Sequence, residues 1–223
     1  MLSRYSPDLL IFDCDGVLVD SEMIASENLA AHLRDHGVDI SAMQCRNRFT
    51  GYSLDRMMAE LIDDGARLPD DFLATLRQRD IIAFARNLKP LPGIISFLKE
   101  STVPRCVASS GITEKIRTNL HTTGLLGFFE RAIFSADMVA NAKPAPDLFL
   151  LAARDMGADP ERCLVIEDSA LGVAAAISAG MRVFGFSGGS HCGPGYPEML
   201  QDAGASAVFA DMADLTELIE AAY

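Results

Sequence analysis

Residues 9–16 read LLIFDCDG, four apolar residues followed by a segment that holds two aspartates and a glycine. A short, uninterrupted apolar run is typical of a strand that is buried on both faces of a parallel sheet. In open parallel sheets, ligands bind beyond the carboxyl ends of the strands. The stretch therefore predicts a central strand, and it places Asp13 and Asp15 where a functional site is expected.

Further apolar runs resemble strands, and helix-length segments separate most of them. Alternation of strands and helices predicts an α/β fold built on a parallel sheet. The expected strands lie at 105–108, 132–134, 163–166, 182–186 and 207–209. The expected helices include 93–99, 113–122, 146–156, 170–179 and 211–222.

Residues 20–88 interrupt this alternation, because they contain no convincing strand pattern. Leu29 and Leu33 are spaced as on one face of a helix, and so are the apolar residues within 57–62. The connector LKPLPG at 88–93 combines two prolines with a glycine, which is typical of a boundary. The sequence predicts a core made of residues 1–19 and 89–223, with an inserted helical domain at 20–88.

The composition is that of an ordinary globular protein, with 49% hydrophobic and 22% charged residues among 223. The formal net charge of -12 opposes non-specific binding to nucleic acid or to anionic lipid. No apolar run approaches the roughly 18 residues that cross a bilayer, and the first residues do not resemble a signal peptide. The five cysteines form no Cys-x-x-Cys pair, so reduced, mostly buried thiols in a cytoplasmic protein are expected.

Polar residues follow other expected strands as well. Ser109 and Ser110 come directly after one of them, and Glu167 and Asp168 come directly after another. Lys143 precedes Pro144, shortly before the expected helix at 146–156. Because the carboxyl ends of parallel strands share one edge of the sheet, these residues predict one acidic site that also accepts phosphate.

The acidic residues of this site require a cation. Asp13, Asp15, Glu167 and Asp168 are costly to bring together unless positive charge neutralises them, and an all-oxygen ligand set beside a phosphate favours Mg2+. Gly16 predicts a turn that makes the first two carboxylates diverge. Asp13 would then face the metal and an electrophile, while Asp15 would reach a leaving group, as nucleophilic and acid/base catalysis need.

Two other groups suit a phosphate. Lys143 supplies a point charge, and Ser109 supplies a hydroxyl together with main-chain amides after the strand. Ser110 has two interpretations: its amide contacts the phosphate, or its hydroxyl caps the helix that starts near Ile112.

The loop at 187–195 is rich in glycine but lacks the Lys-Ser/Thr of a P-loop, so it predicts a flexible connection. His191 in this loop and His121 elsewhere have no Cys, Asp or His at metal-ligand spacing. We therefore expect both imidazoles at the surface or in loops.

Four motifs in this order resemble the haloacid dehalogenase superfamily. They are DCDGVLVDS at 13–21, Ser109 after a hydrophobic strand, KPAPD at 143–147 and EDS at 167–169. The helical insert after the first motif resembles the branch of sugar-phosphate phosphatases and beta-phosphoglucomutases. The resemblance covers nearly the whole chain, and it implies a Rossmann-like core with an inserted α-helical cap.

The resemblance also implies a mechanism for a small phosphorylated metabolite. Asp13 would attack phosphorus to form an aspartyl-phosphate, and Asp15 would protonate the departing oxygen and then deprotonate water. True dehalogenases lack this second aspartate, so halide displacement is not expected. The family's phosphate ligands correspond to Ser109 and Lys143, and its Mg2+ ligands to Asp13, the main-chain carbonyl of Asp15, Asp168 and, directly or through water, Glu167.

The cap is expected to select the substrate, because a closing lid contacts the part of the substrate beyond the phosphate. The segment Thr50-Gly51-Tyr52-Ser53 resembles the cap loop of the family, and Arg48 beside it is a candidate contact to an anionic substrate. Mutases of this branch carry His and Arg where this chain has Ala25 and Leu54. The sequence therefore favours a phosphatase, acting above all on a sugar phosphate.

Three alternatives remain open. A phosphosugar mutase would use the same aspartyl-phosphate but return the phosphoryl group to a sugar. A receiver-like signalling protein would hold a long-lived phospho-aspartate, although receivers are shorter and lack a helical insert. A catalytically idle scaffold is disfavoured because every chemical position is filled. We expect a monomer or a homodimer that binds neither nucleic acid nor membranes.

Overall fold

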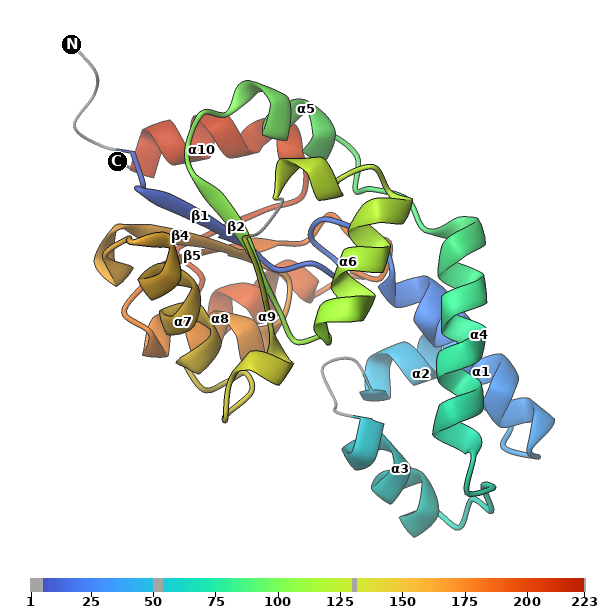
Figure 1. Ribbon diagram of the computed structural model, residues 1–223. Helices are drawn as coiled ribbons and strands as arrows, with labels where there is room; N and C mark the ends of the chain where they lie inside the picture. Colours follow the sequence, from blue (N-terminus) through green and yellow to red (C-terminus); the bar gives the residue numbers. More distant parts are fainter. Residues whose placement is uncertain (1–5, 50–53, 130–131, 223) are drawn as a thin grey trace. The chain divides into compact units, whose positions relative to one another are not determined.

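The chain folds into two units, and Figure 1 shows their elements coloured along the sequence. The computed structural model describes residues 6–49, 54–129 and 132–222. One unit comprises Met1–Asp20 and Lys89–Tyr223, and the other comprises Ser21–Leu88. Each unit buries apolar side chains of its own. The use of the second unit as a substrate-selecting cap stays a prediction.

The larger unit contains a parallel sheet of six strands in the order β3-β2-β1-β4-β5-β6. This order is that of a doubly wound Rossmann-like sheet, so the predicted α/β class is confirmed. The chain reverses its direction of winding between β1 and β4, which makes their carboxyl ends the expected position of a site. The strands are β1 (Leu9–Phe12), β2 (Arg105–Ser109), β3 (Ile133–Ser135), β4 (Cys163–Glu167), β5 (Arg182–Phe186) and β6 (Ala207–Phe209).

The register of the central strands aligns their ends. Phe12 of β1 pairs with Val107 of β2 on one side and with Ile166 of β4 on the other. The amide of Asp13 donates to the carbonyl of Ile166 at 3.0 Å. The three strands therefore end within two residues of one another, and the residues that follow them lie at the same edge of the sheet, as the sequence predicted.

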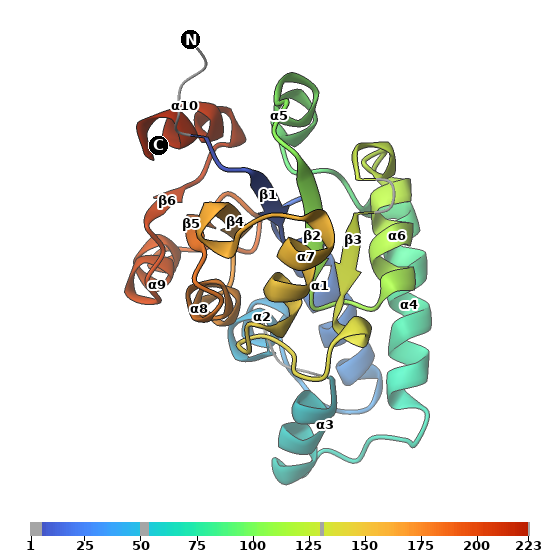
Figure 2. The same ribbon diagram turned by 60° about the vertical axis from the view of Figure 1, so that its left-hand side comes forward.

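Helices cover both faces of the sheet. Figures 1 and 2 show α7, α8 and α9 on one face, and α5 and α10 on the other. Helix α9 has no counterpart among the predicted elements. None of the described helices is both long and apolar enough to cross a membrane. The helices of this unit are α5 (Ile94–Glu100), α6 (Thr113–Thr122), α7 (Asp147–Met156), α8 (Ala170–Ser178), α9 (Tyr196–Asp202) and α10 (Leu215–Ala222).

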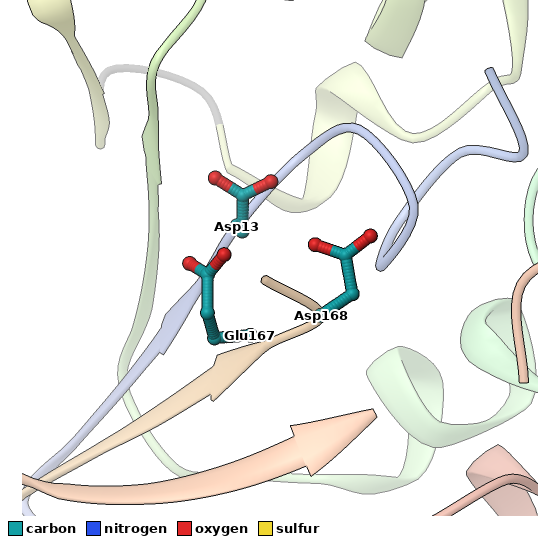
Figure 3. A group of neighbouring side chains, drawn as sticks. All are labelled: Asp13, Glu167 and Asp168. Atoms are coloured by element: carbon teal, nitrogen blue, oxygen red, sulfur yellow. The ribbon is translucent and has the colours of Figure 1, made fainter. Parts of the chain in front are cut away.

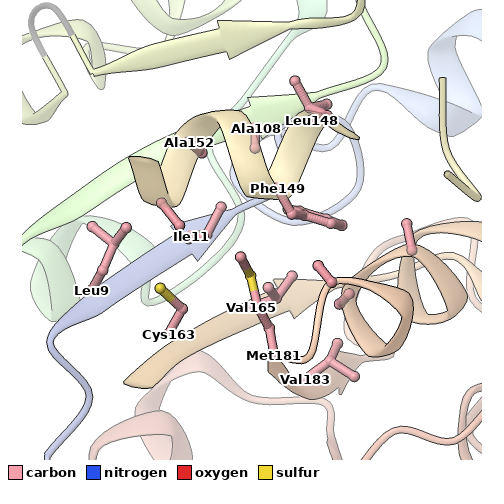
Figure 4. Packing of buried hydrophobic residues seen from close by; sticks show 14 of the residues in the cluster. Leu9, Ile11, Ala108, Leu148, Phe149, Ala152, Cys163, Val165, Met181 and Val183 are labelled. Carbon is pink, nitrogen blue, oxygen red and sulfur yellow. The ribbon is translucent and has the colours of Figure 1, made fainter. Parts of the chain in front are cut away.

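Apolar side chains fill the space on each side of the central strands. Alternate residues of a strand point to opposite faces, so Ile11 packs with Phe149 of α7 on one face, as Figure 4 shows. On the other face, the ring of Phe12 packs edge to face with the rings of Phe97 and Phe129. The ring centroids lie 6.1 Å apart in each pair. Strand β1 is buried throughout, which fixes the direction in which the chain leaves it.

The smaller unit is helical in its described residues. It contains α1 (Glu22–Asp35), α2 (Ala42–Phe49), α3 (Leu54–Asp63) and α4 (Phe72–Asn87). Helices α1 and α3 occupy the two stretches whose apolar spacing predicted helices. Leu29, Leu33, Met57 and Leu61 are buried together, whereas the side chain of Ile62 is exposed.

Candidate active site

Three carboxylates meet at the carboxyl ends of β1 and β4. Asp13 follows β1, while Glu167 ends β4 and Asp168 follows it. Figure 3 shows the three side chains next to one another, with their carboxyl groups projecting to the same side. One ligand oxygen from each lies within 4.8 Å of the others, and all three residues are buried. The structure therefore brings together the three acidic side chains that were predicted as metal ligands, whereas Asp15 was predicted as a ligand through its main-chain carbonyl.

The ammonium group of Lys143 lies inside this cluster. Its side chain is only 4% exposed. Nζ donates to Oδ1 of Asp13 at 2.7 Å, to Oε2 of Glu167 at 2.8 Å and to the carbonyl of Ala108 at 3.1 Å. All three N–H groups of the ammonium therefore have an acceptor within hydrogen-bond distance.

Burial dominates the electrostatics of the cluster. It raises the pKa of Asp13 well above its ordinary value, the charge of Lys143 opposes this, and the carboxylates of Glu167 and Asp168 raise the pKa further. Burial alone would lower the pKa of Lys143, but Asp13 and Glu167 outweigh it, and the pKa is raised. One ammonium faces three buried carboxyl groups, so the cluster retains an excess of negative charge. A hard divalent cation with oxygen ligands fits this donor set.

Helix α8 holds the carboxylate of Glu167 in place. The hydroxyl of Ser169 donates to Oε1 of Glu167 at 2.6 Å, and the amide of Gly172 donates to the same hydroxyl at 3.0 Å. A Cβ atom at Gly172 would lie 2.0 Å from the Glu167 carboxyl carbon. Glycine is therefore required at this position if Glu167 is to lie over the first turn of the helix.

The turn after Asp13 approaches Asp168 closely. Gly16 has a φ of 81°, a conformation that favours glycine. Its amide donates to the carbonyl of Val19 at 2.8 Å, which closes the turn. A Cβ atom at Gly16 would lie 1.9 Å from Oδ2 of Asp168. The turn that the sequence predicted thus has a second role, because it leaves space for the Asp168 carboxylate.

Asp15 is held by two side chains of helix α6. Lys115 donates to Oδ2 of Asp15 at 2.7 Å, and Asn119 donates to Oδ1 at 3.4 Å. Neither residue was predicted from the sequence. They are spaced by four, which places them on one face of a helix, and that helix begins shortly after Ser109. The four-residue spacing of Lys115 and Asn119 is the feature of the sequence that could have indicated a pair of donors facing the site.

The two serines after β2 differ in environment. Ser109 is 1% exposed, and its hydroxyl accepts from the amide of Gly111 at 3.3 Å. Ser110 is exposed. The N-cap residue of α6 is Ile112, and the amide of Thr113 in the first turn donates to the carboxylate of Asp137 at 3.2 Å, so the capping interpretation of the Ser110 hydroxyl is wrong. Contact of either serine with a phosphate stays a prediction.

The candidate cap residues are only partly within the described chain. Thr50, Gly51, Tyr52 and Ser53 lie outside it. Arg48 donates to Glu60 at 2.8 Å and forms an ion pair with Asp64 at 2.6 Å, which ties α2 to α3. Contact of Arg48 with a substrate stays a prediction, and such a contact would compete with these two carboxylates.

His191 corrects an expectation of the sequence analysis. It does lie in the loop after β5, but its side chain is 0% exposed, and Nε2 lies 3.0 Å from Oδ2 of Asp168. The loop, which the sequence predicted as a flexible connection, is anchored by hydrogen bonds from Ser190 to Asp20 and from Ser187 to Phe209. Sequence spacing could not reveal the contact, because its partner follows a different strand. His121 is exposed, as expected.

Comparison with known proteins agrees with this geometry. A family model described as haloacid dehalogenase-like hydrolase matches residues 7–180. The 6-phosphogluconate phosphatase of Escherichia coli is 29% identical over 189 residues, which are 84% of this chain and 86% of that protein. The fructose-1-phosphate phosphatase of the same organism is 33% identical over 189 residues, covering 81% of this chain and 96% of that protein.

A solved structure shares the whole architecture. It is a crystal structure of a haloacid dehalogenase family hydrolase from Deinococcus radiodurans with bound phosphate and sodium. The two chains have a TM-score of 0.83 and 31% sequence identity, and the match covers 98% of this chain and 97% of the other. The likeness extends over both units of the chain.

Proposed function

Because this chain belongs to the haloacid dehalogenase-like hydrolases, we propose that it is a Mg2+-dependent phosphatase that works through a phosphoryl group carried on Asp13. Its named relatives are phosphatases, and the chain is a phosphoric monoester hydrolase like them. One observation carries the proposal. The carboxylate of Asp13 lies at the switch point of the sheet, 2.7 Å from Lys143 and within the acidic cluster of Glu167 and Asp168.

The residues that would hold the cation are the buried carboxylates of Asp13, Asp168 and Glu167, together with the main-chain carbonyl of Asp15. Their oxygen atoms match the preference of Mg2+. When bound, Mg2+ supplies positive charge beside the oxygens of a phosphoryl group. This charge would offset the negative charge that remains after Lys143 has paired with Asp13 and Glu167.

Asp13 would act as the nucleophile, and Asp15 as the general acid and base. An oxygen of Asp13 forms a bond to phosphorus as the bond from phosphorus to the leaving oxygen breaks, and Asp15 gives that oxygen a proton. Asp15 then takes a proton from water, whose oxygen attacks phosphorus and releases the carboxylate of Asp13 with inorganic phosphate. Lys143 and Ser109 hold the peripheral oxygens, where the charge of the phosphoryl group lies.

The proposed substrate is a small phosphomonoester, with sugar phosphates as the first class to test. Two relatives are named for 6-phosphogluconate and fructose 1-phosphate. The inserted domain at 20–88 would select the sugar, with Arg48 and residues 50–53 as candidate contacts. The net charge of -12 suits a small ligand drawn by local cations better than a polyanionic partner.

A screen of phosphorylated metabolites with Mg2+ tests the proposal. Free phosphate and isomerised product are both measured for the parent protein, for Asp13→Asn and for Asp202→Asn, a change at an exposed residue of α9. We expect the parent and Asp202→Asn to release phosphate and Asp13→Asn to release none. Phosphate release by Asp13→Asn at the parent rate would disprove the nucleophile. Isomerised product with little free phosphate would indicate a mutase, and a phospho-form that persists for minutes would indicate a receiver.

A further inference from the structure

The buried imidazole of His191 makes a hydrogen bond to the acidic cluster. Its Nε2 atom lies 3.0 Å from Oδ2 of Asp168, and the side chains are 0% and 7% exposed. A carboxylate can only accept a hydrogen bond. Nε2 therefore carries the proton in this contact, and the imidazole acts as the donor.

Main-chain segments enclose the ring of His191. A Cβ atom at Gly189 would lie 2.5 Å from Cε1 of His191, and a Cβ atom at Gly16 would lie 3.0 Å from the same atom. Ordinary contacts between such atoms are about 3.5 to 4.0 Å. The absence of side chains at these two glycines lets the ring fit between the turn after Asp13 and its own loop.

Other contacts fix the loop that carries His191. The amide and hydroxyl of Ser190 donate to Oδ1 of Asp20 at 3.1 Å and 2.8 Å. The hydroxyl oxygen of Tyr196 lies 3.1 Å from Nε2 of His191, and the two rings meet edge to face with centroids 5.2 Å apart. The ring is therefore held from the loop, from α9 and from the turn after β1.

We propose that His191 is a positioning residue, whose Nε2–H group fixes the Asp168 carboxylate in the orientation in which it binds a cation with Asp13 and Glu167. The inference rests on the proposed function, because it requires a cation at this cluster. A carboxylate on a single side-chain bond rotates readily unless a second group holds it. Removal of such outer contacts typically weakens metal binding by about 10-fold to 100-fold.

Two variants separate the hydrogen bond from the packing. In His191→Gln the amide nitrogen can reach the position of Nε2, whereas in His191→Asn the shorter side chain places it near Nδ1. The probe is Mn2+, whose free concentration is measured by electron paramagnetic resonance without any substrate, at one fixed pH. His121→Asn, at an exposed position of α6, is the matched control. Thermal unfolding of each metal-free variant reports whether it is folded.

We expect His191→Asn to weaken Mn2+ binding by about 10-fold or more, and His191→Gln and His121→Asn to stay within about threefold of the parent. Equal Mn2+ affinity in the Asn and Gln variants, whether tight or weak, would overturn the role of the hydrogen bond. A parent protein that binds no Mn2+ would refute the cation site of the proposed function itself.

A measurement on the parent protein covers the case in which a variant does not fold. With 15N-labelled histidine, Mg2+ should shift the imidazole resonances of a ring protonated at Nε2, and leave those of exposed His121 unchanged. A parent that binds Mn2+ but shows no such shift with Mg2+ would overturn the inference and leave the cation site intact.

Discussion

The ammonium group of Lys115 lies 2.7 Å from Oδ2 of Asp15 and joins helix α6 to the turn after β1. Asn119 reaches the other oxygen of the same carboxylate at 3.4 Å. The two donors fix the orientation of the side chain that we propose as the general acid and base. The orientation of Asp15 therefore depends on a helix that begins after a different strand.

Replacement of Lys115 by Met should lower kcat by about 10-fold and change KM less, because a misplaced acid/base group slows the proton transfer. The Lys115 side chain is 41% exposed, so the loss of the ion pair should reduce the free energy of unfolding by less than about 1 kcal/mol. Steady-state kinetics with the best substrate of the screen provide the measurement. Lys99→Met, at an exposed position of α5, is the control. A Lys115→Met variant with parental kcat would contradict the positioning of Asp15 by this helix.

The pKa of Asp13 predicts how the stability of the metal-free protein depends on pH. Burial raises this pKa in the folded state, so the folded protein retains a proton that the unfolded chain has released. Between the ordinary value of 3.8 and the raised pKa, the folded state binds more protons, and rising pH lowers the free energy of unfolding. The slope from one such group is at most about 1.4 kcal/mol per pH unit.

Asp13→Asn removes this titration, because an amide stays neutral. In urea unfolding with a chelator, the Asn variant should gain stability relative to the parent as pH rises above 3.8. Subtraction of the two curves cancels the carboxyl groups that do not interact with Asp13. Parallel curves for the two proteins would show that Asp13 titrates alike in the folded and unfolded states.

The sequence predicted the central strands and their polar ends for one physical reason. A strand buried on both faces needs an uninterrupted apolar run, and the first polar residue after it marks the edge of the sheet. Asp13, Glu167 and Asp168 follow such apolar runs, and the structure brings them together. Lys143 was found through its motif, and its place inside the cluster follows from its three acceptors.

Contacts that depend on how one element packs on another were not predictable in this way. Lys115 meets Asp15 only because of the rotation of α6, and His191 meets Asp168 only because its loop folds back over the turn. The short helix α9 follows a glycine-rich segment and has only 7 residues, too few for a clear helical pattern, although the proline in its first turn suits the start of a helix. In each case tertiary packing decides the outcome.

Thiol reactivity tests the burial of both units at once. Four cysteines are buried and Cys192 is partly exposed. Burial raises the pKa of Cys45 and of Cys163 to about 11, so only about one thiol in a thousand would be ionised at about pH 8. Burial also raises the pKa of Cys14 and of Cys106.

Ellman's reagent should therefore label one thiol of the folded protein quickly, and the other four only after denaturant is added. Cys192→Ser should abolish the fast phase, because the other four cysteines are buried. Two or more fast thiols in the parent would mean that at least one of the two units opens more readily than its packing implies.

The close approach of Gly172 to Glu167 gives a last prediction. An added methyl group would occupy the position of the Glu167 carboxylate, with Cβ 2.0 Å from its carboxyl carbon. Glu167 would have to move, and its 2.8 Å ion pair with Lys143 would break in a buried environment. Gly172→Ala should therefore lower the free energy of unfolding by about 3 kcal/mol and weaken Mn2+ binding, although alanine favours a helix by about 1 kcal/mol. Gly127→Ala, where nothing lies within 4 Å of the new atom, is the matched control. Urea unfolding of the two metal-free variants measures the difference, and a Gly172→Ala variant as stable as the parent would show that Glu167 does not need the space that this glycine leaves.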